Sequence, residues 1–504
     1  MESQKSHPAN TTLRKNAIVT LDIINVNAKG FGIGRVDDFV LFTEGALPGE
    51  RIEAQIVKLK SRYGFAKISR IITPSPARIT PRCTVAAGLR PSPSGICGGC
   101  QFQHCDYAAQ LEIKKQIVID ALTRIGGFSS PPVADVLGHF DASDTTPWHY
   151  RNKGIFPVAP ADNADGFAIG MYAARSHRLV EIDECLLQHP MHKRVLFVVR
   201  NHMHARKITP YDESSHTGTM RQIMVRTSAA TDEVMVVLVA TCDHLPAEDE
   251  LAQTLVRDAG ATTVLINPHT ARGNTVLGNR FRTLTGSGSI EESIGAVRYR
   301  ISPQSFFQVN SHQVKKLYDI ALQMAGNADY IIDAHAGAGG ITLYAAHQAA
   351  TQGRKLHALG IDIVAAAIND AQKNADLNGI NNVTFQVGAA EEVIPTMLSA
   401  ANAMNCTNGH PNTVSSVPTI SAARPQLVFL DPPRKGCETP LLDALITAHI
   451  PKVVYISCDP ATLARDIKHL HSGGYTLQQV QPVDMFPHTG HVECVALLTK
   501  EESA

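Results

Sequence analysis

The chain has 504 residues, and its 46 Lys and Arg side chains balance 46 Asp and Glu side chains, so its formal net charge is zero. This length exceeds what one ordinary hydrophobic core supports, and we expect two to four domains. A balanced charge neither indicates nor excludes a nucleic acid partner. Any RNA site must therefore come from local clusters of basic residues.

The N-terminus carries no secretory signal pattern, because its first apolar stretch, residues 17–26, is interrupted by Asp22 and Asn25. No run approaches the roughly 20 apolar residues that span a bilayer. We therefore predict a cytoplasmic protein with no membrane partner. Four cysteines lie between Cys83 and Cys105, and in a large chain without an export signal such a group predicts a metal site before disulfides.

The first 73 residues predict a disordered tail followed by a small domain. Residues 1–15 are polar, and residues 16–73 alternate apolar and polar positions between turn signals, which predicts a small β-barrel. Cations among aromatic side chains suit a phosphate backbone and stacked bases, although a solvated sheet face has the same pattern. The residues concerned are Arg51, Lys58, Lys60, Arg62, Tyr63, Phe65, Lys67 and Arg70.

The rest of the chain predicts two larger domains. Residues 74–300 predict a central α+β domain that contains the cysteine group, with a helix from residue 107 that ends at Gly126 and Gly127 and packs on the C-terminal domain. From residue 301 to 504, apolar strands alternate with helical segments, which predicts a Rossmann-like, doubly wound α/β domain. Residues 399–425 are polar and aperiodic, and we expect a flexible insertion there.

A glycine-rich turn indicates a nucleotide-type cofactor. "YIIDAHAGAGG" predicts a strand ending in Asp333, then a turn through Gly337 and Gly340 that lets a ligand approach the backbone at the carboxyl edge of the sheet. Asp362, at the end of the next strand, can accept hydrogen bonds from both ribose hydroxyls. The pattern suits S-adenosylmethionine and dinucleotides, and a plain tight turn has similar glycines.

The segment "SPQSFFQVN" precedes this turn. Asn310 is predicted to cap a helix, with Gln313 completing a capping box. Gln308 then lies just outside the helix, where its amide can bond the methionine end of a cofactor.

"KVVYISCDPATLARDI" predicts a buried strand that ends at Cys458, with Asp459 as helix N-cap. The helix dipole there lowers the pKa of a thiol and favours a nucleophile, whereas Asp459 opposes this, and a small buried cysteine is the plain alternative. Glu493 interrupts an apolar strand. It is either paired in the core or faces a cleft with a raised pKa, as a general base requires.

Five motifs, "CGGCQFQHC", "SFFQVN", "DPPRKG", "SCDPATLARD" and "MFPHTGHVECV", occur in this order. With them, nearly the whole chain resembles the RNA (uracil-5-)-methyltransferases. It is most similar to the branch that acts on 23S ribosomal RNA, which carries an OB-like TRAM barrel and a [4Fe–4S] cluster. Transfer RNA enzymes share the catalytic motifs and stay an alternative. We expect a monomer that acts on RNA, most closely 23S ribosomal RNA.

The resemblance implies roles for individual residues. Cys458 resembles the nucleophile that adds to C6 of uracil, Glu493 the general base, and Asp431 the residue that holds the ring beside the cofactor; Arg434 is expected to contact the substrate. His335 departs from the family pattern, which has an aromatic residue there. The residues expected to bind S-adenosylmethionine are Gln308, Asp333, His335, Gly337, Gly340, Asp362 and Asp431.

The cysteine group is predicted to hold a metal. Cys97 and Cys100 form a C-x₂-C pair, with Cys83 upstream and Cys185 downstream. Four thiolates can hold a [4Fe–4S] cluster or tetrahedral zinc, and the spacing alone does not decide. The resemblance favours the cluster, and Cys105 is an alternative fourth ligand.

Other classes compete with this interpretation. Amino-methyltransferases also carry "DPP", but usually follow it with an aromatic residue instead of Arg434. A non-catalytic RNA-binding or ribosome assembly factor is a second rival. A nicotinamide oxidoreductase is disfavoured by the missing third glycine.

Overall fold

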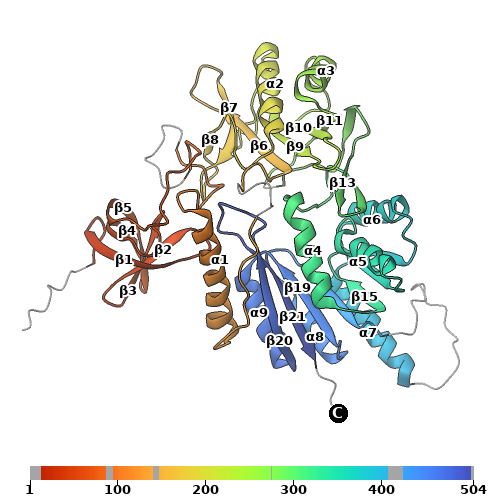
Figure 1. Cartoon of the computed structure of the whole chain (residues 1–504). Coiled ribbons are helices and arrows are strands. Elements are labelled where there is room, and N and C mark those ends of the chain that lie inside the picture. The colour runs from red at the N-terminus through yellow and green to blue at the C-terminus, as the bar shows by residue number, and fades with distance from the viewer. Residues whose placement is uncertain (1–12, 87–94, 140–146, 274, 407–423, 501–504) are drawn as a thin grey trace, which may run out of the picture.

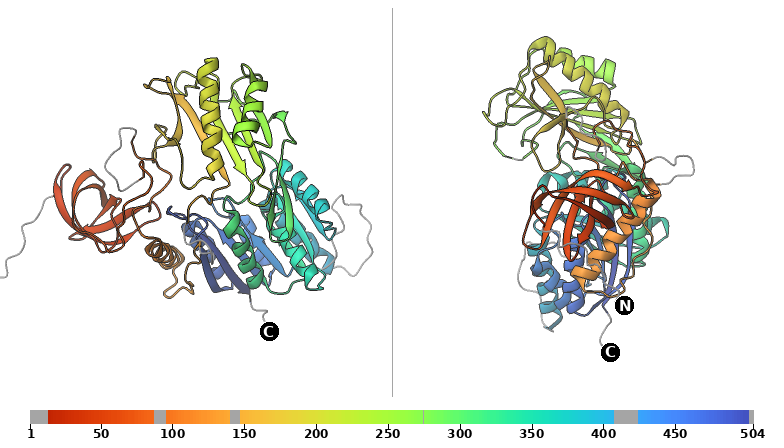
Figure 2. Two further views of the ribbon diagram at one scale, coloured as in Figure 1. Left: turned by 45° about the horizontal axis from the view of Figure 1, so that its top comes forward. Right: turned by 90° about the vertical axis from the view of Figure 1, so that its left-hand side faces the viewer.

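The computed structural model describes residues 13–86, 95–139, 147–273, 275–406 and 424–500, which form three units (Figure 1). A small barrel lies to one side of a large body, whose upper part is a sheet with two helices and whose lower part is a second sheet covered by helices. Figure 2 shows the barrel as a separate lobe beside both sheets. No helix of the described part is long and apolar enough to cross a membrane.

The predicted barrel is present, and it closes in the strand order β1-β2-β3-β5-β4. Leu21 and Ile23 alternate with exposed neighbours along β1 and point into its apolar core. Residues 1–12, most of the expected disordered tail, lie outside the described residues. The strands are β1 (Ile18–Val26), β2 (Phe31–Val36), β3 (Phe39–Glu44), β4 (Arg51–Leu59) and β5 (Tyr63–Thr73).

The central unit is a seven-stranded sheet of order β12-β11-β10-β9-β6-β7-β8, with α2 and α3 packed against each other. Its inner strand β10 is buried along its whole length. Its elements are β6 (Lys153–Pro160), β7 (Phe167–Tyr172), β8 (Leu179–Glu181), α2 (Pro190–Arg206), β9 (Met220–Thr227), β10 (Val234–Ala240), α3 (Glu248–Ala259), β11 (Thr263–Pro268) and β12 (Arg282–Thr285).

Helix α1 (Tyr107–Ala121) continues into a π-helical turn, η1 (Leu122–Gly126), which ends at Gly127 in the left-handed conformation. Both helical segments pack on α9 of the C-terminal domain. On its other side, α1 shares an apolar cluster with Val26 and Leu47 of the barrel and with Phe102. Helix α1 thus lies between the barrel and the C-terminal domain.

The C-terminal domain begins earlier than the expected residue 301. The hairpin β13 (Ile290–Ile294) and β14 (Val297–Ile301) packs against α4, α5 and α6, and the Tyr299 hydroxyl donates to the Gly340 carbonyl oxygen at 2.8 Å. The hairpin therefore belongs to the C-terminal core.

The C-terminal sheet has the order β17-β16-β15-β18-β19-β21-β20. Strands β15 to β19 are parallel, and β21 is antiparallel to both of its neighbours. The elements are α4 (Ser311–Ala325), β15 (Tyr330–Asp333), α5 (Gly340–Thr351), β16 (His357–Asp362), α6 (Ala365–Leu377), β17 (Val383–Val387), α7 (Ala390–Cys406), β18 (Leu427–Leu430), α8 (Thr439–Thr447), β19 (Lys452–Ser457), α9 (Pro460–Ser472), β20 (Tyr475–Val483) and β21 (Glu493–Lys500).

Strand order reverses beside β15, which pairs with β16 on one side and with β18 on the other. In open α/β sheets, a crevice for a ligand forms at the carboxyl ends of the strands at such a switch point. The glycine turn follows β15 and Asp431 follows β18, so the topology brings these two predicted features together.

Two local expectations were wrong. Asn310 caps α4 by accepting from the Gln313 backbone N–H at 3.2 Å, but the Gln313 side chain donates to the Asp484 carbonyl oxygen instead of closing a capping box. Residues 399–406, expected at the start of the insertion, are the end of α7. The remainder of that insertion, residues 407–423, lies outside the described residues.

Candidate functional site

A cavity of about 560 Å³ opens at the switch point of the C-terminal sheet. Its walls come from the turns after β15, β16, β18 and β19 and from the segments before α4 and β21. Most of the residues predicted from the sequence to bind cofactor or substrate, or to catalyse, line it. They are Gln308, His335, Gly337, Asp362, Asp431, Arg434, Cys458 and Glu493.

The glycine turn is held by the carboxylate of Asp362. Its two oxygens accept from the backbone N–H groups of Gly337 at 2.9 Å and Val364 at 2.8 Å. Gly337 has a φ of 53°, and no heavy atom lies within 4 Å of the place its Cβ would occupy. The turn therefore leaves open space where a ligand can approach the backbone.

Asp333 and Gly340 do not line the cavity. The fully buried carboxylate of Asp333 accepts from the Thr342 hydroxyl at 2.6 Å, and burial raises its pKa to about 6. A Cβ at Gly340 would lie 2.5 Å from the Tyr318 hydroxyl oxygen. Both residues support the turn from behind and do not face a ligand.

His335 lines the cavity as an uncharged ring. Burial lowers its pKa to about 4, and its buried Nδ1 has no hydrogen-bond partner among the described residues. A buried polar atom without a partner is costly. The Nδ1 atom thus suits a hydrogen bond to a ligand in this cavity.

The sheet register brings Cys458 and Glu493 together. Ser457 at the end of β19 is opposite Cys494 in β21, so the next residues along this antiparallel pair are Cys458 and Glu493. Burial, followed by the charge of Glu493, raises the pKa of Cys458 to about 12. Burial and Glu493 therefore outweigh any lowering of this pKa by the N-terminus of α9, which Asp459 caps.

Two carboxyl groups and one guanidinium surround the thiol. Burial, then the charge of Asp431, raises the pKa of Glu493 to about 8, and burial raises the pKa of Asp431 to about 7. Arg434 opposes the shifts of Cys458 and Glu493, and its guanidinium lies 3.2 Å from Nε2 of His491. The site combines a thiol, a base with a pKa near neutrality, and the guanidinium of Arg434.

Two aromatic residues of the cavity were not predicted. Phe306 precedes α4 and is 65% exposed, and Phe486 belongs to the loop between β20 and β21. Adjacent phenylalanines in "SFFQVN" were a usable signal, because one exposed aromatic beside a buried Phe307 suits stacking on a base.

The four cysteines predicted to bind metal line a second, small cavity of about 40 Å³. No group of three or more His, Cys, Asp or Glu in the described ranges is arranged to hold a metal ion as the side chains stand. Burial raises the pKa of Cys97 to about 11, partly opposed by a backbone hydrogen bond from Gly99. Burial and then the charge of Cys185 raise the pKa of Cys100 as well. Cys105, the alternative fourth ligand, lies instead in the apolar cluster beside α1.

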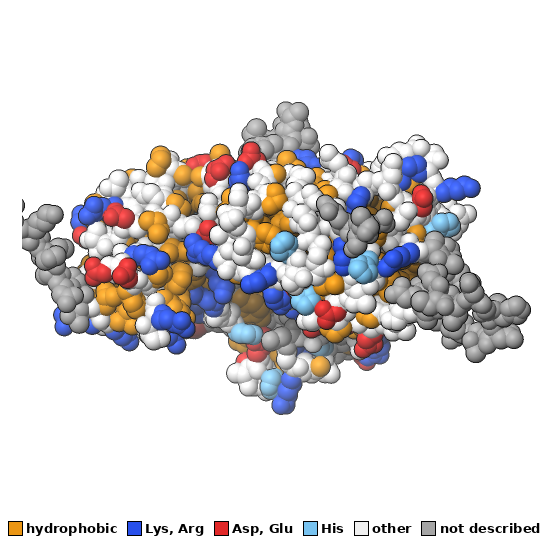
Figure 3. All heavy atoms as spheres, turned by 90° about the horizontal axis from the view of Figure 1, so that it is seen from below, with side chains coloured by type: hydrophobic (Ala, Val, Ile, Leu, Met, Phe, Trp, Pro, Cys, Tyr) orange, Lys and Arg blue, Asp and Glu red, His pale blue; other side chains and the backbone are white. Residues whose placement is uncertain are grey.

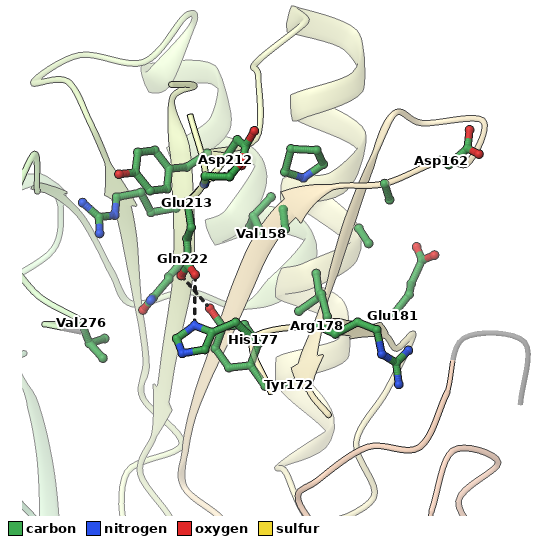
Figure 4. A pocket seen from close by; sticks show the side chains of 18 of the residues that line it. Val158, Asp162, Tyr172, His177, Arg178, Glu181, Asp212, Glu213, Gln222 and Val276 are labelled. Carbon is green, nitrogen blue, oxygen red and sulfur yellow. Dashed lines mark hydrogen bonds and ion pairs between the residues drawn. The ribbon is translucent and has the colours of Figure 1, made fainter. Parts of the chain in front are cut away.

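A larger cavity, about 1240 Å³, opens on the central sheet (Figure 4). There the Glu213 carboxylate accepts from the Tyr172 hydroxyl at 3.2 Å and lies 3.0 Å from Nδ1 of His177. Its walls contain none of the predicted site residues and no cysteine. We therefore assign the chemistry to the smaller cavity at the sheet edge.

Comparison with known proteins identifies the family. Residues 289–501 match the tRNA (Uracil-5-)-methyltransferase family, and residues 14–69 match the TRAM domain. An uncharacterized RNA methyltransferase of Halalkalibacterium halodurans is 38% identical over 98% of this chain and 99% of its own length. A protein of the same description from Listeria innocua is 38% identical over 97% of this chain and 98% of its own.

The fold also occurs in a solved structure. The tRNA (uracil-54, C5)-methyltransferase of Pyrococcus abyssi, in complex with S-adenosyl-L-homocysteine, matches 95% of this chain and 100% of its own with a TM-score of 0.70 and 24% identity. The chain therefore belongs to the RNA (uracil-5-)-methyltransferase family, enzymes that use S-adenosylmethionine to methylate carbon 5 of uracil in RNA.

Proposed function

We propose that the enzyme methylates a uridine of 23S ribosomal RNA through a covalent adduct between Cys458 and C6 of the ring. The observation that carries this proposal is the placement of Cys458, Glu493 and Asp431 in one cavity with the glycine turn. An enzyme cannot reach the carbon atoms of a stacked base, so the target nucleotide is flipped out of its stack into this cavity.

Cofactor binding is assigned to the residues around the turn. Gln308, His335, Gly337 and Asp362 face the cavity and fit an adenosyl ligand, while Asp333 and Gly340 hold the turn in shape. S-adenosylmethionine supplies the methyl group when bound.

Cys458 begins the reaction. Its sulfur forms a bond to C6 as the thiol proton leaves to a neighbouring carboxylate, and the electron pair of the C5–C6 bond moves toward C5 and O4. Carbon 5 then takes the methyl group. Asp431 is positioned to bond the N3–O4 edge of the ring, and Arg434 to oppose the negative charge that develops nearby.

Glu493 ends the reaction. It removes the proton from C5, the C5–C6 double bond reforms, and the sulfur of Cys458 leaves. A base with a pKa near 8 suits this step, because general bases work best near the operating pH.

The four-cysteine cavity is proposed to hold a [4Fe–4S] cluster, with zinc as the alternative. A tetrahedral zinc ion and a [4Fe–4S] cluster can each be held by four thiolates. The four thiols line one small cavity, and the resemblance to the ribosomal RNA branch favours the cluster. Its place beside the RNA-facing domains suggests a structural role.

Transfer RNA stays a second candidate, because the family is named for tRNA and the Pyrococcus abyssi enzyme of the same fold is a tRNA enzyme. The barrel and the four-cysteine cavity together favour ribosomal RNA, by resemblance to that branch.

Incubation with 5-fluorouridine-substituted RNA and S-adenosylmethionine tests the proposal. Fluorine cannot leave as a proton, so a stable protein–RNA adduct accumulates with 23S ribosomal RNA and not with transfer RNA. Cys458→Ala abolishes the adduct. Cys437→Ala, which removes another thiol of the same cavity, leaves it. An adduct that survives Cys458→Ala contradicts the mechanism, and an adduct with transfer RNA alone contradicts the target.

A further inference from the structure

Residues 484–491, in the loop between β20 and β21, accept many hydrogen bonds from other segments of the chain. We call this segment the catalytic loop, because it brings Phe486 to the cavity and ends two residues before Glu493. Five successive carbonyl oxygens, from residue 484 to 488, accept hydrogen bonds from other segments. The donors, in order, are Gln313, Asn310, Lys114, Tyr150, and the backbone N–H groups of Gln101 and Phe102.

Lys114 of α1 is the charged member of this set. Its side chain is completely buried, with Nζ 2.6 Å from Asp484 Oδ1 and 3.0 Å from the Phe486 carbonyl oxygen. The second oxygen of Asp484 accepts from the Tyr107 hydroxyl at 2.9 Å. Burial lowers the pKa of Lys114 and Asp484 opposes that shift.

Burying the Lys114–Asp484 ion pair costs free energy, because both charges lose their hydration. Replacing a buried ion pair by apolar side chains is often neutral or stabilising, so stability alone does not account for a lysine here. An ammonium group does what an apolar side chain cannot, since it donates to the carboxylate and to the loop carbonyl together. The contacts point to a requirement for loop position.

We propose that Lys114 is a positioning residue of the methyl transfer. It fixes Phe486 against the cavity and sets the path of the chain into Glu493, so a helix of the N-terminal half completes the site of the C-terminal domain. The inference rests on the proposed function, because it assigns Lys114 to the step in which Cys458 and Glu493 act on the ring.

The chain carries its own reporter of loop position. Trp148, its single tryptophan, stacks on His488 with ring centroids 3.9 Å apart and an interplanar angle of 18°. The side-chain amide of Gln110 in α1 makes two contacts with His488. Its oxygen accepts from the His488 backbone N–H at 2.9 Å, and its nitrogen lies 3.2 Å from Nδ1 of the His488 ring. Movement of the catalytic loop therefore changes the surroundings of the indole.

The test compares Lys114→Met with Lys115→Met in the full chain. Lys115 is the next residue of the same helix, and it pairs at the surface with Asp135. We expect Lys114→Met to shift the Trp148 emission and to slow adduct formation with 5-fluorouridine RNA about tenfold or more, since misplacement by about 1 Å can cost ~100-fold in rate. Affinity for S-adenosylmethionine stays near that of the parent, and Lys115→Met matches the parent in all three measurements.

The inference is overturned if Lys114→Met keeps the Trp148 emission or the adduct rate of the parent. It is also overturned if affinity for S-adenosylmethionine falls as much as the adduct rate, because that result indicates general damage to the fold. If Lys114→Met does not fold, the double variant Lys114→Met/Asp484→Asn removes both buried charges and must show the same two defects. An adduct that survives Cys458→Ala rejects the proposed function instead, and leaves the loop measurement standing.

Discussion

Three acidic groups, the Cys458 thiol and the carboxyls of Asp431 and Glu493, share the catalytic cavity with the guanidinium of Arg434. Burial raises all three pKa values, and each negative charge makes the next one harder to form. The deprotonated thiol and carboxylate are the reactive forms, so both raised pKa values oppose reaction at low pH. One arginine offsets part of this penalty.

The pH profile of adduct formation follows from these signs. Below a pH of about 8, the pKa of Glu493, both reactive forms become scarcer as pH falls, and the rate falls with them. Arg434→Gln removes the charge that lowers the pKa of Cys458 and Glu493, so we expect the rising part of the profile to move up by about one pH unit. Single-turnover rates measured across pH check this.

Lys435→Gln is the matched control, because Lys435 is the next residue and its ammonium pairs with Glu438 at 2.8 Å. Its profile should coincide with that of the parent. An Arg434→Gln profile that keeps its midpoint and loses only height would contradict the electrostatic role of the guanidinium.

At the scale of residues, the sequence predicted which side chains lie together but not how they shift one another's pKa values or which hydrogen bonds they make. Cys458 and Glu493 could be placed because each lies at a strand end in a recognisable motif. The direction of the Cys458 pKa shift could not be predicted, because it depends first on burial and then on Glu493 and Asp431, which come from other strands. Asp333 belongs to the turn motif, yet only the fold reveals that Thr342 binds its carboxylate.

At the scale of elements, the cysteine segment and the catalytic loop form one packed unit. Gln101, directly after Cys100, donates through its backbone to the His488 carbonyl oxygen at 3.0 Å and accepts through its side chain from the Gly490 N–H at 3.1 Å. A group bound by the cysteines therefore stiffens the segment that holds the catalytic loop.

Cys100→Ala should thus have two effects. If the proposed cluster is present in protein prepared without oxygen, the variant contains less iron and sulfide than the parent, because one of four ligands is missing. The Trp148 emission shifts as well, because Gln101 no longer holds the loop. Cys105→Ala, a change in the apolar cluster beside α1, retains the iron. A parent protein that contains zinc and no iron would refute the cluster.

Elements with strong periodicity were predicted well. Strand β1 of the barrel alternates cleanly, and β15, β18 and β19 of the C-terminal sheet are almost entirely buried. Strand β20 is hard to predict from the sequence, because "YTLQQVQPV" is half polar and resembles a loop. The Gln313 capping box failed because a tertiary acceptor, the Asp484 carbonyl oxygen, takes the side chain.

At the scale of the molecule, the barrel is fixed to the body and reaches the active-site side. Arg175 of the central unit lies over the Phe31 ring at 4.8 Å and pairs with Glu44 at 3.4 Å. A Cβ at Gly490 of the catalytic loop would lie 2.0 Å from the Ala28 carbonyl oxygen, so the first barrel turn packs on that loop. These contacts could not be predicted from the sequence, because they join units distant along the chain.

The barrel also presents cations. Lysine and arginine side chains are spread over the barrel end and the adjoining part of the face seen from below (Figure 3). Lys58, Lys60 and Arg62 are all exposed around the β4–β5 turn, beside the half-exposed ring of Tyr63, which is 39% exposed. Exposed cations around an aromatic ring fit an RNA backbone better than a solvated face, since none of the three has an ion-pair partner in the described part of the chain.

Reversal of these three charges to glutamate therefore predicts a specific loss of RNA affinity. Each phosphate contact contributes about 0.7 to the salt slope of single-stranded RNA binding, so removing three should reduce the slope of log K against log salt by about 2. Affinity for S-adenosylmethionine and the Trp148 emission stay unchanged, because the turn lies on the far side of the barrel strands from Ala28 and the catalytic loop. Titrations of RNA at several salt concentrations measure the slope. If the variant has the same slope as the parent and only a lower affinity, the RNA binds elsewhere on the molecule.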